Sequence, residues 1–183
     1  MARRLAVLTA LTAAAVLGIS TAGPAPAAPA GGPEDPRSVL MGGEASNGAM
    51  MGGYLIVTDF TVGPAGQVLA NGTLNAALTG PPGSVQRRVS QPVTIPIDRG
   101  ASVSTCYMLQ LFVGPADVPL AGEQVHLGRS NFITELREGP GSRLLMPLCG
   151  IRDLLPTADS VTLRDALNDV IRHLAVAAGA DVR

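Results

Sequence analysis

The chain has 183 residues, of which 46% are hydrophobic and only 3% are aromatic, and its formal net charge at neutral pH is −1. This length is enough for one domain with a substantial core. All basic residues are arginines, and they form no long basic stripe of the kind that indicates nucleic-acid binding. The lack of tryptophan and the few other aromatic residues argue against the flat platforms of sugar-binding modules.

Residues 1–30 have the order of features that is typical of a secretory signal peptide. Two arginines precede an apolar run over residues 5–19, which is too short to anchor the mature protein in a bilayer. Small residues follow, and Ala-x-Ala motifs predict cleavage after Ala27 or Ala30. The arginine pair leaves the general secretory and twin-arginine routes both open. We therefore expect a secreted protein whose mature chain has no transmembrane anchor.

Residues 31–53 are rich in Gly, Pro and Ala, so we expect a flexible leader here. A single β-rich domain is expected to follow over residues 54–183. Alternating and β-branched stretches predict its strands. The predicted strands cover residues 54–62, 67–70, 73–78, 89–97, 101–113, 123–127 and 131–137.

Turn and breaker residues set the expected boundaries of these strands. Asn71-Gly72 predicts a type I′ hairpin turn, because both central positions of that turn need a positive φ. Pro92 and Pro96 have no N–H to donate, so their strand is expected at a sheet edge. A Gly-Pro pair is expected to end the long strand over residues 101–113.

Towards the C-terminus the apolar spacing changes to the helical period. Residues 144–155 are predicted to be helical, with Pro147 tolerated because it falls in the first turn. The clearest element is an amphipathic helix over residues 162–178, where Thr162 and Asp165 predict a capping box. The order of elements predicts an α+β fold. It would be mainly antiparallel β, as a sandwich or partly closed barrel, with one or two C-terminal helices.

Cys106 and Cys149 are the only cysteines in the sequence. In an exported chain an isolated pair predicts one disulfide, which would connect a strand to a later helical turn. A metal pair and a redox-active pair are the alternatives, but no histidine cluster accompanies the cysteines and their spacing is not Cys-x-x-Cys. We therefore predict a structural disulfide, with no metal and no cofactor.

The segment between the cysteines carries an ordered set of motifs. A Cys-x-x-Leu-x-Leu strand runs into Gly-Pro, a Val-x-Leu strand follows, and a Gly-Pro-Gly turn precedes a Leu-rich stretch that ends in the second cysteine. This order resembles a family of secreted actinobacterial proteins of uncharacterised role, over residues 54–155. The resemblance implies secretion, a β-rich domain and the cysteine pair, and it implies no activity. The matching residues are Cys106, Leu109, Leu111, Gly114, Pro115, Asp117, Leu120, Gly122, Val125, His126, Leu127, Gly139, Pro140, Gly141, Leu144, Leu145, Leu148, Cys149, Leu154 and Leu155.

Residues that could carry catalysis are few and scattered. The nearest serine motif, at residues 128–132, lacks the final glycine of Gly-x-Ser-x-Gly. A hydrolase that uses His126 with Ser130 or Asp117 is therefore only a third hypothesis. No catalytic, cofactor-binding or metal-binding residue is predicted.

The leading hypothesis is a secreted, non-enzymatic binding or envelope-associated domain with a protein or cell-envelope partner. A carrier of a small apolar ligand is the alternative, suggested by the Leu-, Val- and Met-rich strands between the cysteines. An interior cavity large enough for a small molecule would support the carrier, and a solidly packed interior would count against it.

Overall fold

The computed structural model describes residues 32–80, 87–136 and 143–179, and the predicted signal peptide lies outside them. Within these ranges the chain forms eight strands and then two helices. The elements are β1 (Ser38–Ala45), β2 (Met50–Val62), β3 (Val68–Thr79), β4 (Arg87–Ser104), β5 (Met108–Val113), β6 (Ala116–Leu120), β7 (Glu123–Leu127), β8 (Ser130–Glu135), α1 (Leu145–Thr157) and α2 (Ser160–Ala177).

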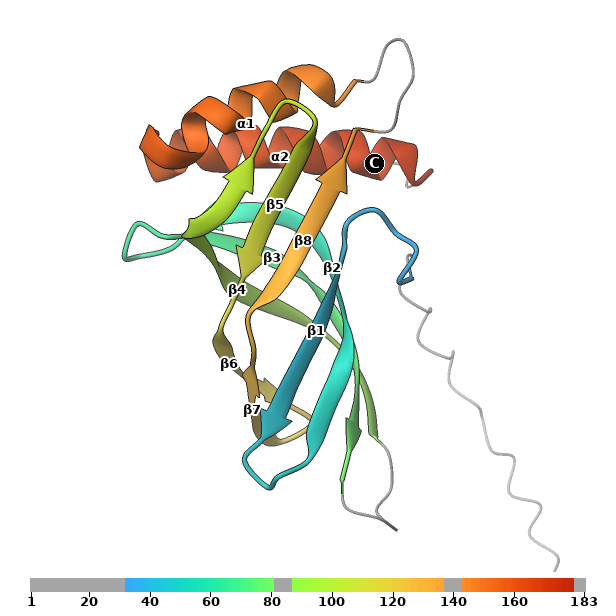
Figure 1. Cartoon of the computed structure of the whole chain (residues 1–183). Helices are drawn as coiled ribbons and strands as arrows, with labels where there is room; N and C mark the ends of the chain where they lie inside the picture. The colour runs from blue at the N-terminus through green and yellow to red at the C-terminus, as the bar shows by residue number, and fades with distance from the viewer. Residues whose placement is uncertain (1–31, 81–86, 137–142, 180–183) are drawn as a thin grey trace, which may run out of the picture.

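The strands pair antiparallel in one sheet with the order β6-β7-β1-β2-β3-β4-β5-β8. The sheet curls into a half-barrel, and the two helices lie across one end of it (Figure 1). The opposite end carries β6, β7 and the turn between β1 and β2 (Figure 1). The predicted α+β class, mainly antiparallel with C-terminal helices, is therefore confirmed. Of the two predicted forms, the sheet takes the curled one.

Side chains of β4 draw the outermost strand β6 towards the rest of the sheet. Gln91 Nε2 donates to the Pro119 carbonyl at 2.6 Å, and Arg87 Nη1 donates to the Ala121 carbonyl at 3.1 Å. Main-chain carbonyls at a sheet edge need partners, and here side chains supply them in place of a ladder. These bonds help the sheet to curl back on itself.

One hydrophobic core lies between the inner side of the curled sheet and the apolar faces of the helices. On β3 the alternation is complete, because the buried Val68, Ala70, Leu74 and Leu78 share the inner face. Burial of each large aliphatic side chain contributes about 1.5 to 3 kcal/mol. Successive residues of a strand point to opposite faces, so the same strand presents its polar residues outward.

The helix α2 confirms the amphipathic helix predicted over residues 162–178 and begins slightly earlier. Its cap differs from the prediction, because Asp159 is the N-cap and accepts from the main-chain N–H groups of Val161 and Thr162. The capping box predicted to start at Thr162 is therefore wrong. The hydrogen bond from the Thr162 N–H is the main cause that lowers the pKa of Asp159 below its usual range.

Asn168 docks α2 onto β2. The Phe60 N–H donates to Asn168 Oδ1 at 2.6 Å, and Asn168 Nδ2 donates to the Phe60 carbonyl at 3.0 Å. This part of β2 lies beyond β1, whose first pair joins Ser38 to Ile56. The Asn168 amide therefore supplies the donor and the acceptor that a neighbouring strand would otherwise supply.

The prediction of a flexible leader over residues 31–53 is wrong for the part of it that the structure describes. All of β1 and the start of β2 lie there. The glycines and methionines of this segment resemble low-complexity sequence, but Met41 and Met51 are buried in the core. The β-rich domain therefore starts well before residue 54.

Asn71-Gly72 lies within β3, so the predicted hairpin turn at these residues is wrong. The turn between β2 and β3 falls at residues 63–67, where the Gly63 N–H donates to the Gln67 carbonyl at 2.8 Å. Gly72 meets a different requirement, because a Cβ at this position would lie 2.2 Å from the Ile56 carbonyl oxygen. The glycine allows two strands to approach closely where the sheet curls.

Residues 89–97 were predicted as an edge strand, but they belong to β4, which lies between β3 and β5. Pro96 is tolerated because its carbonyl accepts from the Gly114 N–H, so its main chain faces away from β3. Pro92 lies four residues earlier and faces the same side. No ladder bond to β3 therefore needs the missing N–H of either proline.

The long strand predicted over residues 101–113 is also wrong, because a turn separates the end of β4 from β5. Within β5 the predicted alternation holds, and Leu109, Leu111 and Val113 are buried. The Gly-Pro pair ends this strand as predicted, but β6 begins directly after it and was missed. The helix predicted over residues 144–155 is confirmed as α1, with Pro147 in its first turn.

Candidate functional site

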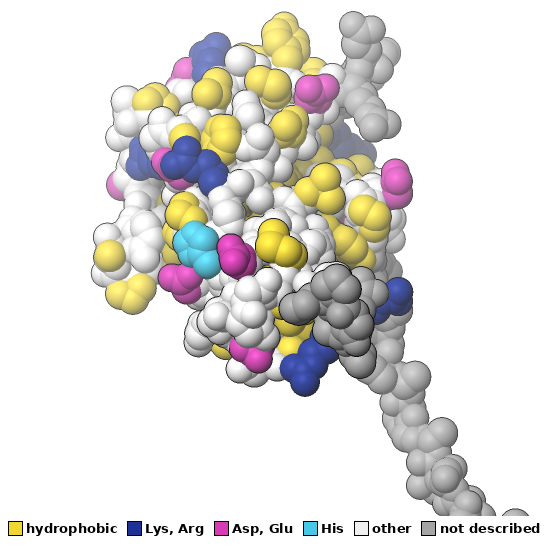
Figure 2. All heavy atoms as spheres, turned by 60° about the horizontal axis from the view of Figure 1, so that its bottom comes forward, with side chains coloured by type: hydrophobic (Ala, Val, Ile, Leu, Met, Phe, Trp, Pro, Cys, Tyr) yellow, Lys and Arg dark blue, Asp and Glu magenta, His cyan; other side chains and the backbone are white. Residues whose placement is uncertain are grey.

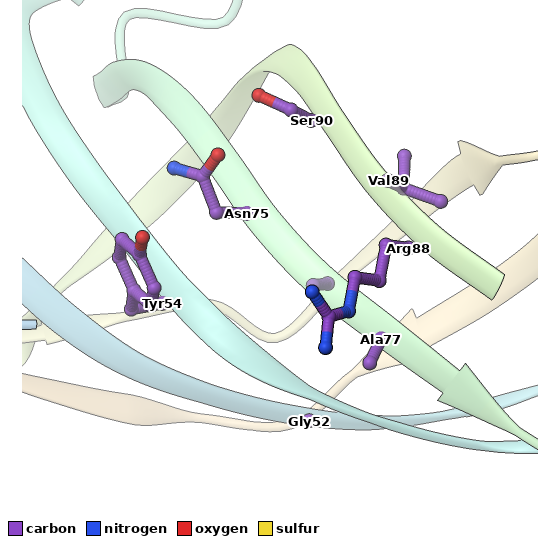
Figure 3. A pocket seen from close by; sticks show the side chains of 8 residues that line it. Gly52, Tyr54, Asn75, Ala77, Arg88, Val89 and Ser90 are labelled. Carbon is purple, nitrogen blue, oxygen red and sulfur yellow. The ribbon is translucent and has the colours of Figure 1, made fainter. Parts of the chain in front are cut away.

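The outer face of β2, β3 and β4 carries a groove of about 460 Å³. This volume lies in the range of small-molecule sites, about 300 to 1,000 Å³. The described lining includes no acidic side chain, so its one formal charge is the positive charge of Arg88. The groove is lined by Gly52, Tyr54, Asn75, Ala76, Ala77, Arg88, Val89 and Ser90 (Figure 3).

The strand register arranges the groove in two rows that cross the strands. The row that we call the Asn75 row consists of Tyr54, Asn75 and Ser90. The neighbouring row consists of Gly52, Ala77 and Arg88. Because Gly52 and Ala77 have almost no side chain, the second row forms a low floor. A ligand that lay on this floor would contact the polar groups of both rows.

A third row, the Asn71 row, lies on the same face of β3 outside the groove. Asn71 Nδ2 donates to Asp59 Oδ1 at 2.7 Å and to Thr61 Oγ1 at 3.1 Å. Thr94 Oγ1 donates to Asn71 Oδ1 at 2.8 Å. Both donors and the acceptor of this amide therefore have partners within the fold.

Asn75 has no such network. Its Nδ2 atom is buried from solvent and has no hydrogen-bond partner among the described residues. Asn75 lies between Tyr54 of β2 and Ser90 of β4, and its amide nitrogen points to the Tyr54 side of the groove (Figure 3). A buried donor without an acceptor costs about 1 to 3 kcal/mol, so native folds rarely leave one unpaired.

Apolar and cationic groups flank the Asn75 amide on opposite sides. Leu40 of β1 pairs with Tyr54 and is 76% exposed, so it extends the aromatic side of the groove with an apolar shelf. Arg88 is exposed, and its side chain reaches from β4 across β3 towards Gly52 (Figure 3). The arrangement offers an apolar surface, an amide donor and a guanidinium within one groove.

The predicted cysteine pair is brought together. Cys106 lies in the turn between β4 and β5, Cys149 lies in α1, and their Sγ atoms are 2.05 Å apart, at disulfide distance. Arg152, in the same helix, places Nη1 3.6 Å from the Cys106 sulfur and forms an ion pair with Asp153. The pair connects the helical end of the molecule to the sheet and is compatible with export.

His126 and Asp117 also meet, at the end opposite the helices. His126 Nδ1 lies 2.8 Å from Asp117 Oδ1, and both side chains are largely exposed. Glu44 lies opposite His126 on β1. No hydrogen bond joins Ser130 to His126 within the described ranges, so a nucleophile is not aligned with this pair. Figure 2 shows this end, with the histidine next to acidic side chains and the basic side chains dispersed.

The most buried ion pair among the described residues lies directly before β1. Asp35 accepts from the Arg37 N–H and from two atoms of its guanidinium, at 2.7 to 3.0 Å. The hydrogen bond from Arg37 lowers the pKa of Asp35 and raises that of Arg37. The Arg37 carbonyl accepts from the Val57 N–H at 3.1 Å, so the pair holds the chain against β2. Its role is structural.

The described part of the chain holds neither a candidate metal centre nor a candidate membrane-spanning helix. No group of three or more His, Cys, Asp or Glu side chains there is arranged to hold a metal ion. No helix in those ranges has both the length and the apolar character to cross a bilayer.

Comparison of the chain with protein-family models, with curated proteins and with solved structures gives no match. The family resemblance noted from the sequence therefore stays a prediction. The candidate site rests on the geometry of the groove alone.

Sequence reasoning did not single out the groove residues. Asn75 and Tyr54 were recognised only as members of predicted strands, and Arg88 was placed in a loop. The outward alternation of Asn71, Thr73 and Asn75 was visible in the sequence, but their cross-strand neighbours depend on a register that the wrong hairpin at Asn71-Gly72 would have changed.

Proposed function

We propose that this chain is an exported, non-enzymatic binding domain and that the groove on β2, β3 and β4 holds its ligand. The observation that carries the proposal is the buried Nδ2 atom of Asn75, which has no partner among the described residues. A hydrogen-bond acceptor on a ligand would relieve the cost of about 1 to 3 kcal/mol that this donor imposes. The fully bonded Asn71 on the same strand indicates that the fold can satisfy such a side chain.

The ligand would reach Asn75 after a small adjustment of side chains. The terminal torsion of an asparagine is broad, so a turn of the amide brings Nδ2 towards the groove. Tyr54 is half-buried and lies beside the amide, so a turn of its ring would widen the same opening. Such rotamer changes are common on binding, whereas the strand backbone would stay in place.

The predicted signal peptide and the cysteine pair at disulfide distance support export. An extracellular or envelope location would expose the groove to small molecules and cell-wall fragments. The same binding role is proposed for the protein if it stays associated with the cell envelope after export.

The two alternative functions have weaker support. Described interior positions of the half-barrel hold packed aliphatic side chains, whereas the groove lies on the outer face, so the carrier of an interior apolar ligand is disfavoured. The hydrolase hypothesis has the His126–Asp117 pair but lacks an aligned nucleophile in the described residues.

The test is native mass spectrometry of the protein secreted by its own host. The wild-type protein, the Asn75→Ala variant and the Asn71→Ala variant would be purified from the culture supernatant under mild conditions. We expect a bound small molecule on the wild-type protein and on Asn71→Ala, and its loss from Asn75→Ala. The same spectra report the N-terminus after signal cleavage and the state of the two cysteines.

Two outcomes would contradict the proposal. One is a wild-type protein that carries no ligand and takes none up from concentrated supernatant. The other is a ligand that both alanine variants retain equally, because the groove would then not be its site.

A further inference from the structure

We infer that the groove recognises a carboxylate, which pairs with Arg88 while a neighbouring carbonyl of the same ligand accepts from Asn75. This inference rests on the proposed function and specifies the chemical class of its ligand. Three observations lead to it: the lack of a partner for Arg88 among the described residues, the character of the groove lining, and the spacing of the two donors.

Arg88 differs from nearly all other arginines that the structure describes. Five of them form ion pairs with aspartates. Arg87 donates to the Ala121 carbonyl, and Arg99 donates to the carbonyls of Leu154 and Leu155 near the end of α1. Arg88 has neither kind of partner in the described ranges, and only Arg143, which borders residues outside them, shares this property.

The chemistry of the lining selects the sign of the ligand charge. A guanidinium has five N–H donors and no acceptor, and the unpartnered group of Asn75 is also a donor. No described lining residue is acidic. The groove therefore offers donors and one positive charge, and a ligand that brings acceptors and one negative charge complements it. A carboxylate fits a guanidinium in a bidentate arrangement and balances its single charge.

The spacing of the donors selects the rest of the ligand. Arg88 pairs with Ala77, and Asn75 pairs with Ser90, so the two donor residues are diagonal neighbours across β3 and β4. Diagonal neighbours have Cα atoms roughly 7 to 8 Å apart, and the long Arg88 side chain reaches across β3 towards Gly52, in the row next to Asn75 (Figure 3). A ligand that carries a carboxylate and a carbonyl a few bonds apart would reach donors in both rows. A flat apolar group beyond the carbonyl would rest on Tyr54 and Leu40.

N-benzoylglycine is a direct probe, because it combines a carboxylate, an amide carbonyl and a flat ring. Its matched control is N-benzoylglycine amide, in which a neutral carboxamide of nearly the same size replaces the carboxylate. Binding is followed by the amide NMR signals of residues 52–54, 75–77 and 88–90 in the full mature protein. We expect the acid to bind at least about tenfold more tightly than the amide, since a hydrogen bond to a charged group exceeds a neutral one by this margin.

Two variants separate the inference from the proposed function. Arg88→Gln keeps donors but removes the charge, so the acid should fall to the affinity of the amide while the amide is unaffected. Asn75→Ala should weaken both compounds. A peptide that ends in Phe-Gly with a free carboxylate, compared with its amidated form, distinguishes a chain terminus from a free small molecule as the source of the group.

Equal binding of the acid and the amide, or an acid affinity that Arg88→Gln leaves unchanged, would overturn the carboxylate inference and leave the binding groove intact. Groove signals that respond to neither compound would also overturn it. If any of these results is found and Asn75→Ala also loses a neutral ligand that the host supplies, the proposed binding function is supported without the carboxylate. Circular dichroism of Arg88→Gln serves as the control for folding, because the exposed Arg88 has no described partner to lose.

Discussion

Asn71 and Asn75 lie on the same strand and the same outer face, yet their surroundings are opposite. The Asn71 amide donates to Asp59 and Thr61 and accepts from Thr94. The Asn75 nitrogen is buried without a partner among the described residues. The same residue type on one face therefore has two different surroundings: one amide connects the strands, and the other keeps a donor without a partner in the described part of the chain.

The largest effect is expected from the cysteine pair, which is remote from both asparagine rows. Replacement of Cys106 and Cys149 by serine opens a loop with a sequence separation of 43 residues. In the chain-entropy account this lowers the free energy of unfolding by about 4 kcal/mol. Urea denaturation of the double variant measures it, with Ser104→Ala as a neighbouring control. A loss below about 1 kcal/mol would mean that the pair contributes little to the fold.

A third asparagine, Asn168, is expected to contribute more to the free energy of unfolding than Asn71 does. Asn168→Ala leaves the N–H and the carbonyl of Phe60 without their partners. We expect a loss of about 2 to 3 kcal/mol in the free energy of unfolding, because both groups are partly buried. Asp165→Ala on the exposed face of α2 is the control and should change stability by less than about 0.5 kcal/mol. Equal losses in the two variants would show that Asn168 is not the docking contact.

Asn71→Ala should have a smaller effect, because its hydrogen bonds lie at an exposed surface. We expect a loss of about 1 kcal/mol in the free energy of unfolding, measured by urea denaturation. Asn75→Ala is a well-matched control, since it makes the same substitution on the same face of the same strand. If Asn71→Ala cost no more than Asn75→Ala, the contrast between the two rows would be broken.

Acid should weaken the segment that holds β1 against β2. The pKa of Asp35 is lowered in the folded state by the hydrogen bond from Arg37. Its contribution is fully present above the unfolded pKa of about 3.9 and is lost as the pH falls through the lower folded value. Urea denaturation at a series of acidic pH values should therefore show a steeper loss for the wild type than for Asp35→Asn. Parallel curves would show that the Asp35–Arg37 ion pair makes no pH-dependent contribution to stability.

Asn75→Ala is expected to give the smallest change in stability and a large change in binding. Removal of an unpaired buried donor should leave the free energy of unfolding within about 0.5 kcal/mol of the wild type, or raise it. Thermal denaturation of ligand-free protein measures this. A clear destabilisation would indicate that the Nδ2 atom of Asn75 has a partner in solution. The main observation behind the proposed binding groove would then be wrong.

The sequence determined the features that depend on local pattern. Alternation of apolar residues predicted most strands, the helical period predicted α1 and α2, and two isolated cysteines predicted their pairing. These features rest on spacing within one segment, so neighbours along the chain are enough to indicate them. The leader was misjudged because its Gly-rich composition suggests disorder, whereas here the glycines lie in paired strands and Met41 and Met51 are buried in the core.

Which side chains meet across strands depends on the pairing of segments that are distant in the chain. A glycine at position 72 is compatible with a hairpin turn or with a close approach of two strands. The Ile56 carbonyl lies so near that no Cβ would fit, so this glycine marks a close approach. The strand register places Asp59 and Thr94 beside Asn71, and it places Tyr54 and Ser90 beside Asn75. These partners are separated by many residues in the chain, and a shift of one residue would turn every one of them to the other face. Asn71 and Asn75 look alike in the sequence, but the curled sheet makes the first a structural contact and leaves the Nδ2 atom of the second without a partner among the described residues.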